Sequence, residues 1–158
     1  MGQNRTVVLT GGGGIIGRAM AVALTSAGHR VAVVDRDLDA ATAAVEQVDI
    51  GSVRAYRGDV TDRESLLELR ARVEADLGAV EALVCNAAAK SENFFAAFPD
   101  FPIEDWDEVM ATNLTGPMLC AQVFGPPMAD AGAGVIINVL SIYGIVAPDQ
   151  RIYEGSEY

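Results

Sequence analysis

The sequence predicts an α/β fold in which helices cover both faces of a doubly wound, parallel sheet of about five strands. Three observations support this prediction: short β-branched runs alternate with segments of helical period, a glycine-rich turn follows the first run, and an acid ends the second. Continuous apolar strands such as VAVV and VIIN indicate that both faces of the sheet are covered. Strands that alternate with helices imply right-handed crossovers, and we expect the strand order 3-2-1-4-5.

The first half of the chain alternates strands and helices. Gly28 ends the first helix, because glycine readily adopts the left-handed conformation common after helices. Asp37 or Asp39 caps the second helix, whose first backbone amides need acceptors. The expected elements are a strand at 5–10, a helix at 15–28, a strand at 29–35, a helix at 37–48 and a strand at 52–60.

The second half continues the alternation with longer helices. Thr61 and Glu64 form a predicted capping box for a helix that runs to about Leu77 and stops at Gly78. Pro117 lies in a later helical stretch and costs about 3 kcal/mol in a helix interior, so we expect a kink or two helices there. The expected elements are a strand at 80–88, a loop at 87–103, a helical stretch at 104–130 that opens with acids, and a strand at 134–141.

Composition predicts a single domain over residues 1–158. Eleven basic and 22 acidic residues give a net charge of −11, which argues against nucleic acid and anionic membranes as partners. No apolar run approaches the roughly 18 residues of a membrane span. Cys85 and Cys120 have neither metal-ligand spacing nor a disulfide framework, so we expect no metal site and a reducing, cytoplasmic location.

The stretch LTGGGGIIGRA joins the first strand to the first helix, and Gly12, Gly14 and Gly17 fit the pattern G-x-G-x-x-G. Glycines there let the backbone approach a pyrophosphate, whose charge the helix N-terminus then binds. Asp35 ends the second strand, where a carboxylate binds the hydroxyls of the adenosine ribose and repels a 2′-phosphate. NAD is therefore favoured over NADP as the cofactor, and the neighbouring Arg36 weakens that preference.

With these features the chain resembles the classical branch of the short-chain dehydrogenase/reductase family over essentially its whole length. The resemblance implies a Rossmann-type fold and reversible hydride transfer between NAD(P) and a small alcohol or carbonyl substrate. It also implies a homo-oligomer for the full-length form. The matching motifs are Thr10-Gly11 with Gly17, Asp59-Val60 after the third strand, Asn86-Ala87-Ala88 (with Ala in place of the family's last Gly) after the fourth, Asn113 in NLTG, and Ser141 at the end of INVLS.

The resemblance also assigns roles to individual residues. Ser141 would hydrogen-bond the reacting oxygen, and Asn113 would hold a water in the proton relay. Asp59 and Val60 would contact adenine. The full set that it assigns to cofactor binding is Gly11, Gly14, Ile16, Gly17, Asp35, Arg36, Asp59, Val60, Asn86, Ala87 and Ala88.

The glycine loop departs from the family pattern. Ile15 replaces the second motif glycine, and the spacing Thr10-Gly11-x-x-Gly14-x-x-Gly17 is that of the extended branch, which includes sugar-nucleotide epimerases. Every later motif is classical, so we interpret the loop as a local variant in which Gly14 supplies the close approach. Whether Ile15 shifts the pyrophosphate stays open at this point.

A second departure is the missing Tyr-x-x-x-Lys, in which the Tyr exchanges the hydroxyl proton and the Lys lowers its pKa. An unperturbed Tyr has a pKa near 10, so only about 0.1% is ionised at pH 7. Tyr153 lies one residue short of the usual spacing from Ser141, and its lysine position holds Glu157, whose charge raises the pKa of a Tyr. Tyr158 has no residue after it, and Lys90, the only lysine, is interpreted as a solvated loop residue.

We therefore expect a truncated, N-terminal part of a dehydrogenase, incomplete on the C-terminal side of its sheet, that binds NAD weakly and turns over negligibly. The fifth strand would be an open edge, and the apolar face of 109–124 would lack a covering helix. The alternatives are a non-catalytic dinucleotide-binding or regulatory protein, and the N-terminal half of an extended-branch sugar-nucleotide epimerase or dehydratase. The aromatic residues of the loop at 89–103 are interpreted as packing, with a substrate mouth as the alternative: Phe94, Phe95, Phe98 and Phe101.

Overall fold

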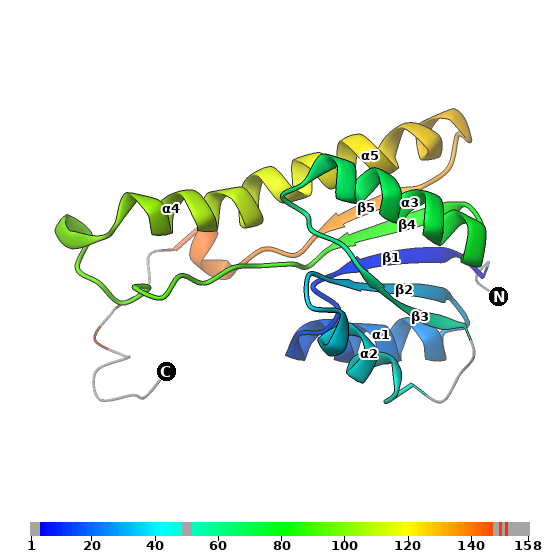
Figure 1. The fold of residues 1–158 in the computed structure, drawn as a ribbon, viewed down its shortest axis with the longest axis horizontal. Helices are drawn as coiled ribbons and strands as arrows, with labels where there is room; N and C mark the ends of the chain where they lie inside the picture. Colours follow the sequence, from blue (N-terminus) through cyan, green and yellow to red (C-terminus); the bar gives the residue numbers. More distant parts are fainter. Residues whose placement is uncertain (1–3, 49–51, 147–148, 150, 152–158) are drawn as a thin grey trace.

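The computed structural model describes residues 4–48, 52–146, 149 and 151. Its strands form one sheet in the order β3-β2-β1-β4-β5, and every neighbouring pair is parallel (Figure 1). The predicted α/β class and strand order are thereby confirmed. The strands are β1 (Thr6–Thr10), β2 (Arg30–Asp35), β3 (Val53–Arg57), β4 (Val80–Cys85) and β5 (Val135–Asn138).

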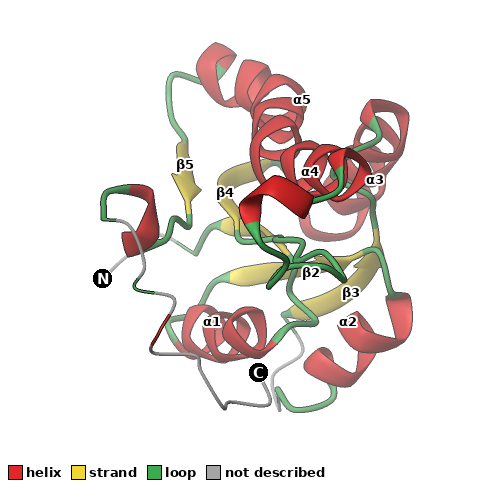
Figure 2. Cartoon of the chain, turned by 90° about the vertical axis from the view of Figure 1, so that its left-hand side faces the viewer, coloured by secondary structure: helices red, strands yellow, loops and turns green. Residues whose placement is uncertain are grey.

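Helices pack on both faces of the sheet, α1 and α2 on one face and α3 and α5 on the other (Figure 2). The helices are α1 (Ile15–Ser26), α2 (Leu38–Val45), α3 (Arg63–Leu77), α4 (Ile103–Met110) and α5 (Gly116–Asp130), with short 3₁₀ turns at Phe98–Asp100 and Ile142–Gly144. The alternating side chains of β1 serve both layers. Val7 and Leu9 pack in the cluster under α1 and α2, whereas Val8 packs in the cluster under α3 and α5.

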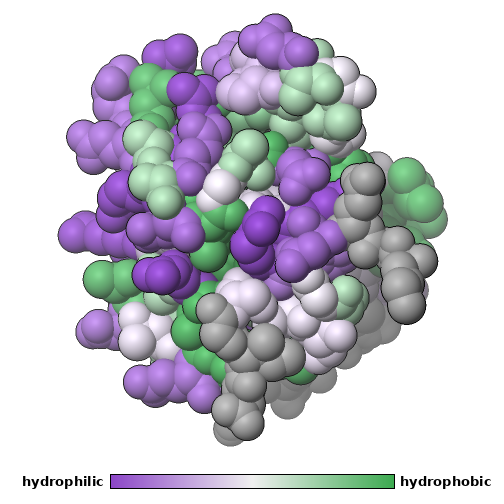
Figure 3. Space-filling view, turned by 90° about the vertical axis from the view of Figure 1, so that its right-hand side faces the viewer, coloured by the Kyte–Doolittle hydropathy of each residue, from purple (hydrophilic) through white to green (hydrophobic). Residues whose placement is uncertain are grey.

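One end of the sheet has a largely hydrophilic surface (Figure 3). Figure 3 shows the end opposite to that of Figure 2, and hydrophilic side chains occupy much of it, with hydrophobic groups scattered among them. The strands begin at that end (Figure 1). Their carboxyl ends, where open α/β sheets bind ligands, therefore lie at the end seen in Figure 2.

The helix ends in the first half lie close to their predicted positions. The Asp37 carboxylate accepts a hydrogen bond from the Asp39 amide at 3.0 Å, so Asp37 rather than Asp39 caps α2. Gly28 follows α1 with a φ of +89°, which confirms the predicted left-handed end of that helix. The second helix stops at Val45, before the predicted residue 48.

The predicted capping box of α3 is wrong. Asp62 caps the helix and accepts a hydrogen bond from the Glu64 amide at 2.9 Å. The Thr61 hydroxyl donates instead to the Asp59 carboxylate at 2.7 Å, because an ionised carboxylate is a strong acceptor within its reach. The predicted end at Leu77 is confirmed, and the following glycine adopts a positive φ.

The prediction that both faces of the VIIN strand are covered is wrong for the described residues. β5 pairs with β4 on one side, and no described strand lies on its other side. Val135, Ile136 and Ile137 are 36%, 37% and 49% exposed. An apolar run becomes buried only where a second layer or strand meets it, and the described chain leaves β5 as the expected open edge.

The stretch predicted to bend at Pro117 consists of two helices joined by a π-helical turn. α4 ends at Met110, the π turn spans Ala111–Thr115, and α5 begins at Gly116. Pro117 is the second residue of α5 and directly follows the π turn, at the point where the regular helical pattern is interrupted. The expectation of an interruption is confirmed. Glycine suits position 116, since a Cβ there would lie 2.9 Å from the Val60 side chain.

Cys85 ends β4 and Cys120 lies on α5, and both are buried free thiols in the core cluster between the sheet and α3 and α5. Their sulfurs are hydrogen-bonded to each other. That bond raises the pKa of Cys120, to which burial adds, and lowers the pKa of Cys85.

Pro126 and Pro127 lie inside α5, and each leaves a carbonyl one turn earlier without its usual donor. The carbonyl that residue 127 would normally bond belongs to Val123, and the Arg70 guanidinium of α3 donates to it at 2.8 Å. Val123 is 1% exposed, so water does not readily replace this bond. The Arg70 side chain thus links α3 to α5 and replaces the backbone donor that Pro127 lacks.

We predict that Arg70→Met lowers the free energy of unfolding by about 1–3 kcal/mol, the usual cost of leaving a buried acceptor unsatisfied. In a Pro127→Ala background the restored amide bonds the Val123 carbonyl, so the same substitution costs less and the two changes couple. Urea denaturation across this double-mutant cycle measures the coupling. Arg63→Met, at an exposed position of the same helix, is the control. Equal costs of Arg70→Met in both backgrounds contradict the assignment.

Candidate functional site

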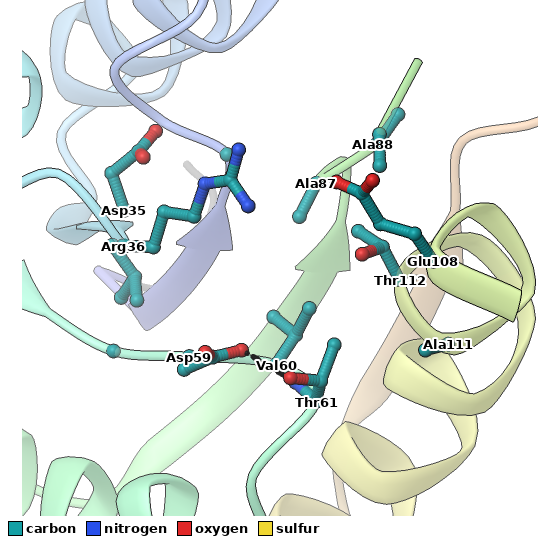
Figure 4. A pocket seen from close by; sticks show the side chains of 14 residues that line it. Asp35, Arg36, Asp59, Val60, Thr61, Ala87, Ala88, Glu108, Ala111 and Thr112 are labelled. Carbon is teal, nitrogen blue, oxygen red and sulfur yellow. Dashed lines mark hydrogen bonds between the residues drawn. The ribbon is translucent and has the colours of Figure 1, made fainter. Parts of the chain in front are cut away.

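A pocket of about 260 Å³ lies at the carboxyl ends of the strands (Figure 4). The chain runs from β1 outward to β2 and β3 and then crosses back to β4, so the loops after β1 and β4 leave the sheet in opposite directions. Such a switch point is where open α/β sheets bind ligands. The lining residues are Gly11, Val34, Asp35, Arg36, Gly58, Asp59, Val60, Thr61, Ala87, Ala88, Ala89, Glu108, Ala111 and Thr112.

Thr10 and Asn86 fix the two loops to each other. The Thr10 hydroxyl donates to the Val84 carbonyl at 3.3 Å and accepts from the backbone amides of Asn86 and Ala87, both at 3.1 Å. The Asn86 side-chain amide donates to the carbonyls of Thr10 (3.1 Å) and Gly11 (3.0 Å). Asn86 does not line the pocket, because its side chain is used to hold the glycine turn in place.

The glycine turn packs too tightly for side chains at most of its positions. Gly11 has a φ of +62°, and a Cβ there would lie 2.7 Å from the Ala87 Cα. A Cβ on Gly17 would collide with the Gly11 carbonyl oxygen and lie 2.7 Å from the backbone of Gly12. Gly14 is different, since the nearest atom to its Cβ would be at 3.4 Å, an ordinary contact. Packing therefore demands glycine at 11 and 17 but not at 14.

The Asp35 carboxylate is held at the edge of the pocket by backbone amides. Its oxygens accept hydrogen bonds from the amides of Gly13 at 3.1 Å and Asp37 at 3.2 Å. A Cβ on Gly13 would lie 2.9 Å from that carboxylate, so glycine at 13 allows the carboxylate to reach the turn. Both interactions keep an ionised acceptor at the position where a ribose hydroxyl would donate.

The Asp59 carboxylate lies on the segment after β3. It accepts from the Thr61 amide at 2.8 Å and the Thr61 hydroxyl at 2.7 Å, and the Asp59 amide donates to Ser65 at 3.0 Å. These bonds fold the segment into a tight turn just before the start of α3. Val60, between the two polar residues, contributes an apolar wall to the pocket.

Asn113 lies in the π turn between α4 and α5. Its side-chain oxygen accepts from the Ala89 amide at 2.7 Å, and its side-chain nitrogen donates to the Ala89 carbonyl at 3.1 Å. π turns occur inside helices at functional positions, where the extra residue redirects side chains. Both ends of the Asn113 amide are thus engaged with the loop after β4, and its predicted contact with a water remains a prediction.

Ser141 follows β5 and begins the 3₁₀ turn at Ile142–Gly144. Its oxygen accepts from the Tyr143 amide at 3.2 Å, so its O–H is left to donate elsewhere. The side chain is exposed and does not line the pocket. Tyr153, Glu157 and Tyr158, which bear on the missing proton-transfer motif, lie outside the described residues.

Lys90 is exposed on the loop after β4, as expected, and it also contacts two aromatic rings. Its ammonium group lies 4.7 Å from the centre of the Phe94 ring and 4.9 Å from that of Phe95. The two rings meet edge to face at 5.0 Å. Phe98 is 93% exposed, so core packing does not explain the whole aromatic group.

The structure therefore brings together only part of the predicted set. Gly11, Asp35, Arg36, Asp59, Val60, Ala87 and Ala88 line one pocket, whereas Gly14, Ile16, Gly17, Asn86, Asn113 and Ser141 do not. Sequence reasoning missed several lining residues. Thr61 carried a signal, because it follows a predicted contact pair, and Ala111 and Thr112 directly precede Asn113. Glu108 had no signal of its own beyond lying one helical turn before Thr112.

Two further features concern the described residues: the grouping of their metal-ligating side chains and the length of their helices. No group of three or more His, Cys, Asp or Glu side chains among them is arranged to hold a metal ion. No helix in that part of the chain has the length and apolar character needed to cross a bilayer.

Comparison with known proteins gives consistent matches. The family model "short chain dehydrogenase" matches residues 5–156. D-threitol dehydrogenase of Mycolicibacterium smegmatis is 33% identical over 152 residues, covering 95% of this chain and 57% of that protein. Acetoacetyl-CoA reductase of Rhizobium meliloti is 38% identical over 142 residues, covering 90% and 57%. The chain thus spans 57% of the length of each of these relatives.

Solved structures are similar in fold. A short-chain type dehydrogenase/reductase from Mycobacterium marinum superposes with a TM-score of 0.84 at 30% identity, covering 93% of this chain and 59% of that one. NAD⁺-bound xylitol dehydrogenase gives a TM-score of 0.82 at 29% identity, covering 91% and 55%.

We predict that Gly17→Ala destabilises the protein by about 1–3 kcal/mol, the usual cost of overpacking, because its Cβ collides with backbone atoms that cannot move independently. Gly14→Ala has room and an ordinary negative φ, so it leaves stability unchanged or raises it by about 0.5 kcal/mol. Chemical denaturation of the two matched variants measures the difference. Equal effects at both positions contradict the described packing of the turn.

Proposed function

Because the chain belongs to the short-chain dehydrogenase family, we propose that it forms the cofactor-binding part of an NAD(P)-dependent oxidoreductase acting on a small alcohol or carbonyl compound. The observation that carries the proposal is the switch-point pocket with the Asp35 carboxylate held at its edge. When bound, the nicotinamide cofactor supplies the chemistry of hydride transfer. This chain's residues supply the binding and orientation.

The pocket residues fit an adenosine diphosphate group. Asp35 is placed to accept from the ribose hydroxyls, and apolar side chains such as Val60 and Ala111 offer walls for a flat base. The N-terminus of α1 has neither a side-chain cap nor an acid in its first turn, so its amides are left for a diphosphate. Ile15, at the start of that helix, is 92% exposed and borders the same amides.

NAD is the proposed cofactor. The Asp35 carboxylate favours a free 2′-hydroxyl as a donor, and its charge opposes a 2′-phosphate at short range. Arg36 lies beside it and offers a positive charge to a phosphate. We give the carboxylate the larger weight, because its position is fixed by two backbone amides and it faces the ribose site directly.

The proposed catalytic role of this chain is to hold and polarise the reacting oxygen. The Ser141 hydroxyl has its O–H available to donate to that oxygen. Asn113 fixes the loop after β4 through Ala89. The proton itself needs an ionisable group with a depressed pKa, and no Tyr in the sequence has a Lys four residues later. We propose that the 158-residue chain binds the cofactor and turns over negligibly.

A non-catalytic dinucleotide-binding protein is the second candidate. The pocket and the Asp35 carboxylate at its edge support nucleotide binding by such a protein as well. The two candidates agree on the pocket and differ on proton transfer. The extended-branch alternative depended on the glycine at position 14. A Cβ added there would make only an ordinary contact, so the packing of the turn does not require glycine at that position.

We predict that the chain binds NADH more tightly than NADPH and that Asp35→Ser reduces this preference by about tenfold or more, since a hydrogen bond to a charged group contributes about 1.5–3 kcal/mol. Fluorescence titration with each reduced dinucleotide measures the ratio. Asp39→Ser removes an equal charge from the first turn of α2, outside the pocket, and is the control. Tighter NADPH binding by the wild type, or an unchanged ratio in Asp35→Ser, would falsify the NAD assignment.

We also predict that purified chain of verified intact mass reduces NAD with secondary alcohols at a barely measurable rate at neutral pH. An unassisted Tyr is only about 0.1% ionised at pH 7, so proton transfer limits the reaction. Continuous absorbance recording of NADH formation measures it, with cofactor binding checked on the same sample. Fast turnover by a sample that binds NAD would overturn the prediction and reveal a different base.

A further inference from the structure

β5 is one of the two edge strands of the described sheet, and no described strand pairs with its outer side. Figure 2 shows it at one margin of the sheet, beyond β4. Val135, Ile136 and Ile137 make up most of the strand, and each is at least 36% exposed. The unpaired backbone groups of such an edge are a template for a further strand, unless the sequence opposes the pairing.

The hydrogen bonds to β4 indicate which backbone groups of β5 point outward. The Val139 amide donates to the Cys85 carbonyl at 3.0 Å, so the backbone of residue 139 faces β4. The N–H and C=O groups of successive residues in a strand point alternately to its two sides. The backbone of Ile137 therefore also bonds toward β4, whereas the amides and carbonyls of Ile136 and Asn138 face outward.

The side chains of β5 divide between the two faces of the sheet. Ile136 faces α5, since a Cβ on Gly125 of that helix would lie 3.6 Å from the Ile136 Cδ1. Ile137 therefore points to the opposite face, where it is 49% exposed. When a second β5 runs antiparallel along the edge with Ile136 opposite Asn138, the two Ile137 side chains meet at the centre as a close pair.

The distribution of charge indicates that the partner is a second copy of this chain. Each copy has a net charge of −11, so two copies repel each other unless they meet over an uncharged surface. Asp130 is the only charged residue between positions 109 and 148, the part of the sequence that contains α5 and β5. A basic partner, by contrast, would gain no electrostatic attraction from an uncharged edge.

β3, the opposite edge strand of the described sheet, is protected against such pairing. Arg54 and Arg57 are exposed on β3, and charged side chains on an edge oppose pairing with another chain. The residues of β5, Val135–Asn138, include neither a charged residue nor a proline. Because each copy then has one unprotected edge among its described strands, pairing of two β5 strands uses both edges and closes at a dimer.

We propose that β5 is an interaction surface for a second copy of this chain, in which two β5 strands pair antiparallel about a two-fold axis. The same residues of both copies make the contact, and the two sheets become one continuous sheet. Asn138 at the end of the paired strand lies three residues before Ser141, and no residue of β5 lines the nucleotide pocket. Dimer formation and cofactor binding are therefore separate properties of the chain.

Sedimentation equilibrium of the complete chain tests the proposal. We expect a mass twice that of the 16.6 kDa chain. The association tightens as sodium chloride rises from about 0.05 to about 0.5 M, because salt screens the repulsion between two acidic copies. Ile137→Lys places two like charges at the axis and weakens the association by about a hundredfold or more. Ile103→Lys makes the same change at an exposed isoleucine of α4 and leaves the dimer intact.

Asn138→Pro is a second variant, which removes only an outward donor. The Asn138 amide does not bond β4, so proline keeps the fold and breaks a hydrogen bond of the proposed pair. A cooperative thermal transition verifies that each variant is folded. Amide hydrogen exchange of the wild type adds a direct readout, since the amides of Ile136 and Asn138 are protected in the dimer and lose that protection on dilution.

Five results overturn the proposal. A monomer at every accessible concentration shows that the edge does not pair, and protection of the two outward amides in a monomer assigns the edge to another segment of the same chain. A dimer that survives both Ile137→Lys and Asn138→Pro uses a different face. Association that weakens with salt indicates ion pairs rather than an uncharged edge. Assemblies that grow beyond two copies with concentration show that the contact does not close.

Discussion

The Thr10 hydroxyl and the Asn86 side chain hold the ends of β1 and β4 together where the loops above them diverge. Thr10 is 1% exposed, so its hydroxyl depends entirely on the partners that this contact supplies. The contact presses Gly11 against Ala87, and the Gly11 carbonyl in turn excludes any side chain at Gly17. The start of α1 and one wall of the pocket are therefore positioned by a few hydrogen bonds at the centre of the sheet.

A second constraint places the opposite wall. A π turn joins α4 to α5 and contains Asn113, which bonds both backbone groups of Ala89, together with Ala111 and Thr112, which line the pocket. α5 has two prolines and is braced against α3 by Arg70. Helix irregularities that cost stability in isolation thus adjoin one side of the site, and for Pro127 the Arg70 guanidinium offsets the unmade backbone bond.

The sequence predicted the features that depend on local rules. The strand at 5–10, the acid at the end of β2 and the glycine turn before α1 follow from the β-branched run, the position of the loop and the glycine pattern. Features that depend on distant partners were missed. Glu108 lines the pocket from a helix that is distant in sequence from the strands beside it, and the Thr61 hydroxyl donates to the Asp59 carboxylate instead of capping α3. The VIIN strand was expected to be covered, since an apolar run does not reveal which neighbours will meet it.

Ser141 depends on the least supported strand of the described sheet. Among the described strands β5 pairs with β4 alone, through pairs such as Cys85 with Asn138 and a hydrogen bond from the Val139 amide to the Cys85 carbonyl at 3.0 Å. Leu140, between that bond and Ser141, is 86% exposed. No pocket residue comes from β5, so the nucleotide site and the position of Ser141 have separate supports. Covering the outer side of β5 would tighten the geometry of Ser141 while leaving the nucleotide pocket unchanged, because the Thr10–Asn86 contact already fixes the pocket from within the sheet.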